Sequence, residues 1–342
     1  MEKENYEEFL HNQVWTRFIH KPYNHLVDYA DEDGNASIPS GEECKNGIPT
    51  VMGWATPIAD GAFFTGLYLY GLCVRDEKIR KSAKADTDAA AAVRKEEILK
   101  LMNGLFLLDD VSPVDGFIAR GVASDGVSHY PYRSEDQFGP WVLGLWKLYN
   151  TDLPSAETKE KIRVHILRAI AGMKRTGYDI PTEIEQVTRG SFAHDDWRGV
   201  CKLLFCMAVE VKLTGDPDAL REYQSLCEEH PDGSIFSRLE IASHGFANDM
   251  VRDTSLIQFW IDICAHLCLR ALGEADPAHK EYFDAGRRSN AFCTSAFLKD
   301  VDRFNQEHTV RLNMNWRELL PEMRPWHSPD EAVAEAGRVS SL

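Results

Sequence analysis

Aspartate residues stand at the starts of several apolar stretches of this chain, and they are its clearest candidates for acid–base chemistry. The most crowded start lies in residues 130–141, where Ser134 occupies the position of a helix N-cap and Asp136 lies in the first turn. The helix dipole alone favours an acid there, so a simple cap is one interpretation. The other candidates around this turn are Tyr130, Tyr132, Arg133 and Gln137. Aromatic rings that stack on pyranose rings, beside charged and amide groups for the hydroxyls, predict a sugar-binding rim.

Three further apolar stretches begin in the same way. Asp60 precedes residues 61–72, Asp196 precedes residues 197–207, and Asp249 comes shortly before residues 254–272. The polar and aromatic residues that accompany the last two starts are His194, Trp197, Arg198, His244 and Asn248. An N-cap is the competing interpretation of Asp60 and Asp196, and the glycine after Asp60 suits a tight turn.

Glycoside hydrolysis usually requires one protonated and one ionised carboxyl group. We expect Asp136 to be the general acid/base and Asp196 its partner, and we expect Asp60 and Asp249 to contact substrate. Arg120 follows an apolar stretch in a loop, and its guanidinium matches the carboxylate of an acidic sugar. A salt bridge that holds the loop is the alternative for Arg120.

A polysaccharide lyase would draw on other groups from the same stretches. The candidates for proton transfer are His194, His244, Tyr130 and Tyr132, and those for neutralising a uronate are Arg120 and Asn248. His194 also stands next to Asp195 and Asp196, but no well-placed second histidine completes a metal-ligand set. We therefore expect neither a metal nor a cofactor.

The composition narrows the possible partners. A net charge of −16 repels phosphate backbones, so we expect no nucleic acid to bind, and no stretch is long and apolar enough to predict a membrane span. Cysteines such as Cys201, Cys206, Cys264 and Cys268 lie within apolar helical stretches and form no CxxC pair. This pattern favours a reducing, cytoplasmic location, although an exported protein whose signal peptide had been removed would look the same. No feature of the sequence indicates an oligomeric state.

The hydrophobic periodicity predicts an all-α chain. Helices are expected at residues 6–20, 58–74, 89–108, 155–175, 218–229 and 278–298, and in the apolar stretches that follow Ser134, Asp196 and residue 253. Three apolar stretches end in Gly or Asn followed by Asp and Pro, which predicts a C-cap, an N-cap and the first turn of a charged helix. The sequence therefore predicts repeated αα-hairpins. The polar segment 22–54 is longer than most connections, which indicates a functional loop.

In each predicted hairpin the first helix is apolar nearly all round and the second is amphipathic. Closing the hairpins into a ring would place the apolar helices inside, with all their N-termini at one end. The aspartates would then converge in one cleft walled by the irregular segments 22–54, 112–133, 176–193 and 230–248. An open α-solenoid is the alternative, in which the aspartates would line a ridge.

Three motifs in residues 50–300 resemble those of the (α/α)-toroid, six-hairpin glycosidase-like enzymes. They are the stretch beginning at Asp60, the stretch of residues 116–120 that ends in Arg120, and residues 134–139. The resemblance is to the branch of unsaturated glucuronyl and rhamnogalacturonyl hydrolases, and it implies that an aspartate at an inner helix start, best matched by Asp136, acts as general acid/base. It also implies an α/α toroid, either complete or incomplete, since four hairpins are clear and the family has six. We expect one toroid domain over residues 1–320 and a C-terminal tail or edge segment over residues 321–342.

Together these features predict a glycoside hydrolase that acts on an acidic or plant-type oligosaccharide by carboxylate acid/base catalysis. A lyase that acts on uronic-acid-containing glycans is the second interpretation. The third is a non-catalytic helical-repeat module that binds a protein partner through an acidic concave face. The enzyme interpretations require the aspartates to meet in a pocket, whereas the module predicts them along an open surface.

Overall fold

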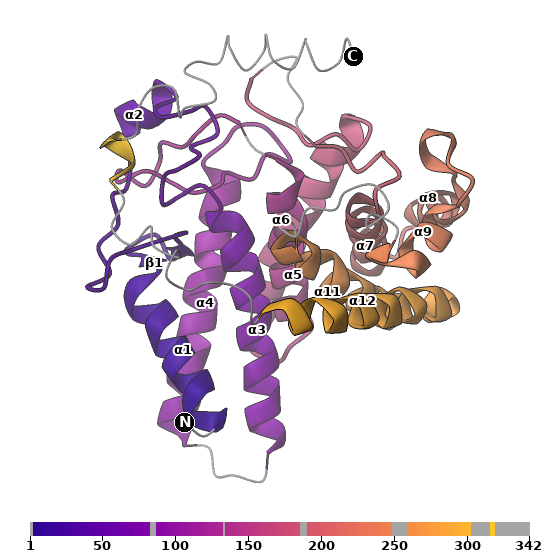
Figure 1. The fold of residues 1–342 in the computed structure, drawn as a ribbon, viewed down its shortest axis with the longest axis horizontal. Coiled ribbons are helices and arrows are strands. Elements are labelled where there is room, and N and C mark those ends of the chain that lie inside the picture. Colours follow the sequence, from indigo (N-terminus) through magenta and orange to yellow (C-terminus); the bar gives the residue numbers. More distant parts are fainter. Residues whose placement is uncertain are drawn as a thin grey trace. The chain divides into compact units, whose positions relative to one another are not determined.

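The computed structural model is all-α, as the periodicity predicts, and it describes residues 3–82, 87–132, 134–184, 190–247, 259–301 and 315–318 (Figure 1). The chain forms two compact units. Unit 1 comprises residues 1–165, 181–189 and 311–342, and unit 2 comprises residues 166–180 and 190–310. None of the described helices combines the length and the apolar character needed to cross a membrane.

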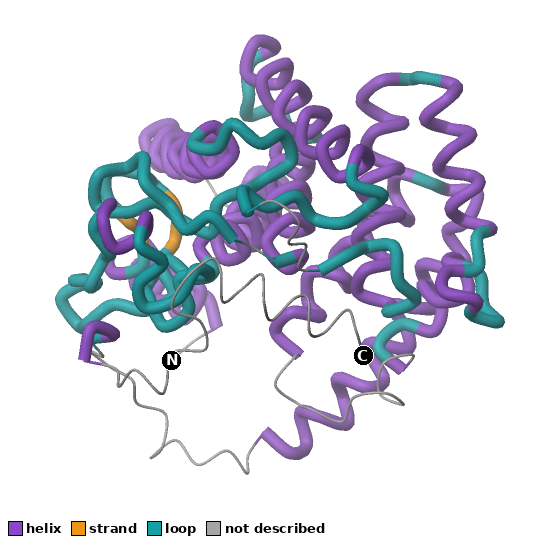
Figure 2. The backbone as a smooth tube through the Cα atoms, turned by 90° about the horizontal axis from the view of Figure 1, so that it is seen from above, coloured by secondary structure: helices purple, strands orange, loops and turns teal. Residues whose placement is uncertain are grey.

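Unit 1 contains a small antiparallel pairing and most of the long helices. Its elements are α1 (Lys3–Arg17), β1 (Ile19–His20), β2 (His25–Leu26), α2 (Gly41–Lys45), α3 (Gly61–Lys81), α4 (Asp88–Asp110), α5 (Glu135–Tyr149), the start of α6 (Ala156–Arg175) and η5 (Trp316–Glu318). In the strand pairing, Ile19 lies opposite Leu26. The irregular segments of this unit lie beside the two strands (Figure 2), where the amide of Ser124 donates to the carbonyl oxygen of Pro39.

Unit 2 is built from helical hairpins. Its elements are the rest of α6, α7 (Trp197–Thr214), α8 (Pro217–Glu228), η1 (Pro231–Gly233), α9 (Arg238–His244), α11 (Phe259–Ala275), η3 (Pro277–His279) and α12 (Lys280–Val301). The turn between α7 and α8 follows the predicted pattern closely. Gly215 is a left-handed C-cap with φ 64°, Asp216 caps α8, and Pro217 begins it.

Some helix boundaries differ from the prediction. Residues 230–248 were expected to be irregular, yet they contain α9, which begins with a capping box between Ser237 and Glu240. Gly273 lies inside α11 rather than after it, because the helix continues to Ala275. Helix α3 likewise extends through the charged residues after Val74 to Lys81. In these places a capping box or the helix propensity of the residues maintains a helix where the apolar periodicity is absent.

Helices α3 and α5 run parallel and touch backbone to backbone. A Cβ atom added to Gly66 would overlap the carbonyl oxygen of Pro140, and one added to Gly144 would lie 2.5 Å from the carbonyl oxygen of Gly66. Nearer the helix starts, the amide of Phe63 donates to the side chain of Gln137 over 3.0 Å. The two N-termini, which carry Asp60 and Asp136, therefore lie at the same end of the pair.

Helices α7 and α11 form a second parallel pair, in unit 2. At their starts the Arg198 guanidinium lies 3.7 Å from the Asp262 carboxylate. Further along, Cys206 lies near Cys264: burial raises the pKa of the Cys206 thiol, and the Cys264 thiol raises it further. Helix α12 returns antiparallel to α11, since Asn290 contacts His266 near one end and Lys280 approaches Gly273 at the other. Within each unit, neighbouring apolar helices thus begin at the same end.

The glycine contact between α3 and α5 predicts a position-specific effect of added methyl groups. Gly66→Ala forces the Cβ atom into the backbone of α5, and we expect a loss of about 1–3 kcal/mol in the free energy of unfolding, as for other overpacked sites. Gly71→Ala, on the exposed side of the same helix with open space around its Cβ, should instead add up to about 1 kcal/mol through helix propensity. Urea denaturation measures both; equal effects would contradict the close contact.

Candidate functional site

The first-turn amides of α3 are satisfied by other segments of unit 1. The amide of Asp60 donates to the Asp28 carboxylate over 2.9 Å, and that of Phe63 donates to Gln137 over 3.0 Å. The carbonyl oxygen of Arg120 accepts a further first-turn amide over 2.8 Å. Asp60 occupies the N-cap position, yet its own side chain makes no capping hydrogen bond. Its carboxyl group is thereby available for other contacts.

That carboxyl group lies on the guanidinium of Arg120. Arg120 Nη1 donates to Asp60 Oδ1 over 2.7 Å and also to the carbonyl oxygen of Ala59. On the other side of the fork, Nη2 lies 2.5 Å from Ser134 Oγ and 3.9 Å from Asp136 Oδ1. The arginine side chain is only 3% exposed. A single buried guanidinium therefore binds the carboxyl group at the start of α3 directly and reaches the one at the start of α5 through the Ser134 hydroxyl.

The start of α5 departs from ordinary capping in the same way. Ser134 is its N-cap residue, as predicted, but its hydroxyl makes no capping hydrogen bond. The hydroxyl donates instead to Asp136. Gln137 completes the arrangement, because its Nε2 atom donates to Asp60 Oδ1 over 2.8 Å while its Oε1 atom accepts from α3. We name Asp28, Asp60, Arg120, Ser134, Asp136 and Gln137 the aspartate cluster.

Burial and mutual repulsion favour protonated carboxyl groups in this cluster. The pKa of Asp28 is raised well above its usual value by burial and by the neighbouring Asp60 carboxylate. The pKa of Asp60 is also raised, chiefly by burial, with Asp136 adding to the shift while Arg120 opposes it. The side chains of Asp60 and Asp136 remain 21% and 13% exposed. The cluster thus combines carboxyl groups whose pKa values are raised with side chains that remain within reach of solvent.

Several candidates in unit 1 lie too deep to bind a sugar directly. Tyr130 and Tyr132 are 1% and 2% exposed, so the predicted aromatic rim is corrected: their rings are part of the core. The Tyr130 hydroxyl donates to the carbonyl oxygen of Ile48. Arg120 and Gln137 are 3% and 0% exposed, and both donate hydrogen bonds to Asp60 Oδ1. Aromatic composition could not distinguish a rim from a core.

The candidates in unit 2 lie at the start of α7, where Asp196 makes an ordinary cap. Asp196 is the N-cap of α7, and its Oδ1 atom accepts from the amide of Gly199 over 2.8 Å. Trp197, predicted to contact substrate, is fully buried, and Arg198 lies 3.9 Å from Asp196 as well as near Asp262. Asp196 and Asp136 belong to different units, so their partnership stays a prediction.

The remaining candidates are peripheral or lie outside the described residues. His194 is 61% exposed, and its Nδ1 atom lies 2.8 Å from Asp232. His244 ends α9 and packs edge-on against Phe236, with ring centroids 4.5 Å apart. Three candidates fall outside the described residues: Arg133, Asn248 and Asp249.

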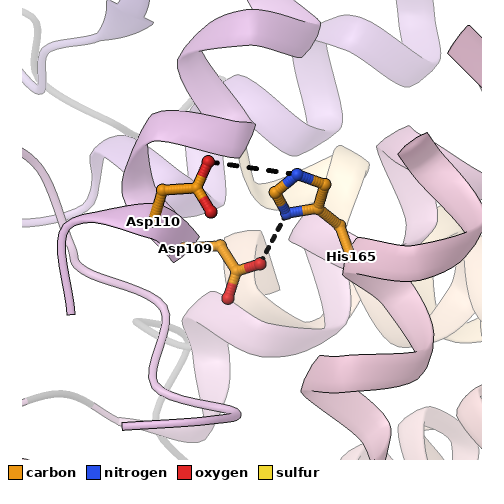
Figure 3. Close-up of side chains that lie close together, drawn as sticks. All are labelled: Asp109, Asp110 and His165. Carbon is orange, nitrogen blue, oxygen red and sulfur yellow. Dashed lines mark hydrogen bonds and ion pairs between the residues drawn. The ribbon is translucent and has the colours of Figure 1, made fainter. Parts of the chain in front are cut away.

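Within the described part of the chain, Asp109, Asp110 and His165 form a group with metal-ligand spacing (Figure 3). His165 Nδ1 lies 2.7 Å from Asp109 Oδ2, while its Nε2 atom lies 4.0 Å from Asp110 Oδ2. The ring also stacks on Phe106, with centroids 4.1 Å apart. His165 therefore links α6 to the last two residues of α4.

Comparisons of the chain with models of known protein families, with curated proteins and with solved structures found no match.

Asp28 is the member of the aspartate cluster that sequence analysis missed. It lies in the long polar segment 22–54, whose length indicated a functional loop, but no local pattern marks this residue among the other acids there. In unit 2, Asp262 was missed as well. It is the acid in the first turn of a largely apolar helix, and an acid among those apolar neighbours was the signal that could have identified it.

The raised pKa of Asp28 predicts how stability depends on pH. Folding favours the protonated form of Asp28. The contribution of Asp28 to the free energy of unfolding is therefore fully present below the usual pKa of 3.8, and it is lost as the pH rises through the raised pKa. Asp28→Asn keeps an acceptor for the Asp60 amide and does not ionise. Relative to the wild type, we expect the variant's free energy of unfolding to increase from about pH 4 to about pH 8.

Asp31→Asn, in the same loop, is the control, because its effect on stability should change with pH in the opposite direction. The pKa of Asp31 is lowered, first by the hydrogen bond from the Asn35 side chain, so its contribution is present above its usual pKa and lost as the pH falls. This variant should therefore be less stable than the wild type at neutral pH, with a difference that shrinks on acidification. Urea denaturation across the pH range measures both, and two parallel profiles would contradict the assignment for Asp28.

Proposed function

We propose that the protein is a glycoside hydrolase whose acid/base groups are the carboxyl groups of Asp60 and Asp136. The observation that carries this proposal is the buried Arg120 fork, which holds both carboxyl groups at the starts of two parallel helices. Ordinary N-caps do not explain the arrangement, because Asp60 and Ser134 both give up their capping hydrogen bonds to it. Two carboxyl groups in different environments are what glycosidic cleavage requires.

The roles follow from the contacts. Asp60, whose pKa is raised, is the general acid that protonates the departing sugar oxygen. Asp136 accepts a hydrogen bond from Ser134, which suits a carboxylate that activates water or stabilises the positive sugar ring. Arg120 and Gln137 are positioning residues. This pair replaces the pair of Asp136 and Asp196 expected from sequence, since Asp60 and Asp136 share one guanidinium.

The proposal extends to the fold and the substrate class. Parallel apolar helices that begin at one end, seen as α3 with α5 and as α7 with α11, support an α/α toroid of helical hairpins. The resemblance to unsaturated glucuronyl and rhamnogalacturonyl hydrolases supports an acidic or plant-type oligosaccharide as substrate. Asp136, the best match to that family's acid/base position, lies within the aspartate cluster.

Incubation with a panel of uronic-acid-containing and neutral plant-type oligosaccharides, including pre-cut unsaturated ones, tests the activity. A hydrolase produces new reducing ends without new ultraviolet absorbance, or removes the absorbance of unsaturated sugars. We expect Asp60→Asn and Asp136→Asn each to lower the rate by about 10²–10⁴-fold, the usual contribution of a general acid or base. Asp152→Asn, an exposed aspartate of the same unit, is the matched control and should retain the wild-type rate.

Full activity in the folded Asp136→Asn variant would contradict its role. Rising absorbance together with new ends would identify a lyase instead. Turnover of no sugar in the panel by the folded wild type would count against a carbohydrate-cleaving enzyme of the proposed substrate class.

Asp196 provides a further discriminating variant. As an N-cap its carboxylate is replaceable by a hydroxyl, so Asp196→Ser should leave both stability and turnover near wild type, whereas Asp196→Ala should cost about 1 kcal/mol in the free energy of unfolding. Thermal or urea denaturation and the sugar assay measure these effects. Loss of turnover by a stable Asp196→Ser variant would restore Asp196 as a partner in catalysis.

A further inference from the structure

The strand pairing of unit 1 contains two histidines that the proposed hydrolase site does not use. His20 and His25 lie opposite each other in β1 and β2, with ring centroids 4.9 Å apart and ring planes at 82°. His20 is 9% exposed, and His25 is fully buried. Burial of two adjacent imidazoles disfavours a charge on either ring. We name His20 and His25 the histidine pair.

The hydrogen-bond partners fix the tautomer of both rings. His25 Nδ1 lies 2.9 Å from the carbonyl oxygen of Leu26, which can only accept, so this nitrogen carries the ring proton. The amide of Val122 donates to His25 Nε2 over 3.3 Å, so that nitrogen carries none. His20 Nδ1 lies 3.1 Å from the same Nε2 atom and therefore donates to it. A second proton on His25 would point at two N–H donors.

The described groups that pack against the histidine pair are uncharged. The ring of Tyr23 lies edge-on to that of His20, with centroids 5.0 Å apart. A Cβ atom added to any of three glycines would lie within 3.1 Å of His25; these are Gly61 of α3, Gly104 of α4 and Gly121. Arg120, next to Gly121, directs its guanidinium into the aspartate cluster. Burial accordingly lowers the pKa of His20 to about 3, with His25 adding to the shift, and burial lowers the pKa of His25 to about 4.

The histidine pair joins two segments that reach the aspartate cluster. One is β2 with its continuation to Asp28, whose carboxylate accepts from the amide of Asp60 over 2.9 Å. The other carries Arg120, which lies two residues before Val122. Because His25 belongs to β2 and its Nε2 atom accepts from Val122, the ring links the two segments directly. Loss of this bond would free the backbone beside Arg120 from β2.

We propose that the histidine pair is an acid-sensitive contact: while neutral it holds residues 120–122 on β2, and in mild acid it releases them and loosens the aspartate cluster. Release exposes both rings to water, where each takes up a proton at its ordinary pKa, so acid favours the released form. His20 and His25 are thus positioning residues for Arg120. The effect on catalysis rests on the proposed function, whereas the release itself does not and is measured without a sugar.

Linkage gives the sign and the size of the effect. The usual pKa of both histidines is 6.5, and in the folded state the values are about 3 and about 4. Because these values are lowered, the contribution of the pair to the closed form is fully present above pH 6.5 and is lost progressively as the pH falls toward them. Between about pH 7.5 and about pH 5.5, each histidine favours the released form by about tenfold and the two together by about 100-fold.

Amide hydrogen exchange of the full chain at about pH 7.5 and about pH 5.5, corrected for the intrinsic effect of pH on exchange, tests the release. The protection of the Val122 amide should fall by about 100-fold. The amide of Ala62, which donates to the carbonyl oxygen of Arg120, should lose protection with it. Amides in the middle of α7, in unit 2, should keep theirs. Constant protection of Val122 or Ala62, or an equal fall in α7, would overturn the proposal.

Removal of one titrating ring tests the pair itself. His20→Asn places an amide N–H where the Nδ1 donor lies, so it keeps a donor to His25 and does not titrate. The protection of Val122 should then fall by only about tenfold over the same pH range. His230→Asn, at an exposed histidine of unit 2, is the matched control and should retain the fall of about 100-fold. Equal falls in the two folded variants would contradict the role of the pair.

Nitrogen-15 chemical shifts of the imidazoles provide a test that needs no variant. At about pH 7.5 both rings of the wild type should be neutral with the proton on Nδ1, as their partners require. A proton on His25 Nε2 would overturn the proposal, because the bond from Val122 could not then form.

Discussion

The backbone contact between α3 and α5 is the constraint on which the aspartate cluster depends. Gly66 and Gly144 let the two helices approach so closely that a methyl group at either position would meet the opposite backbone. Because the helices run parallel, this approach brings both N-termini to one place. Gln137 then reaches both the α3 backbone and the Asp60 carboxyl group. A looser pairing would leave Asp60 and Asp136 as two separate caps.

The ionisation of the carboxyl groups in the aspartate cluster depends on how many of them share one cation. Asp28, Asp60 and Asp136 surround the single guanidinium of Arg120, and burial disfavours carboxylate charge that this guanidinium does not balance. Raised pKa values at Asp28 and Asp60 are the result. An isolated N-cap aspartate, stabilised by helix amides and open to water, experiences neither effect. At Asp196, by contrast, the carboxylate accepts a capping hydrogen bond from the amide of Gly199.

The two units use similar helix pairs for different local chemistry. In unit 1 the N-cap side chains of α3 and α5 make no capping hydrogen bonds and contact the Arg120 guanidinium instead. In unit 2, α7 keeps its Asp196 cap, and Asp262 at the start of α11 lies 3.7 Å from the Arg198 guanidinium. In both units the first turn of a helix presents backbone amides without partners inside the helix and carries an acidic residue nearby. The neighbouring segments determine which contacts that acid makes.

Features that depend on nearby residues were determined by the sequence. Apolar periodicity predicted helices in both units, and short-range capping rules predicted the N-cap position of Ser134 and the turn through Gly215 and Asp216. The same rules offered an N-cap as one of two interpretations of Asp60 and Asp196, and both residues occupy that position. One helix was not predicted: residues 237–240 carry the capping box that begins α9, although this segment was expected to be irregular.

The contacts that give those positions their chemistry were decided by the tertiary structure alone. Arg120 meets Asp60 across 60 residues of chain, and Gln137 meets it across 77, so no local pattern records either contact. The same holds for the burial of Tyr130, whose ring packs against Gly53, and for Asp28, whose partner is a backbone amide at the start of α3. Side-chain type states which bonds a residue can form. Only folding, by burying some groups and bringing distant ones together, selects the bonds that form and shifts the pKa values that follow from them.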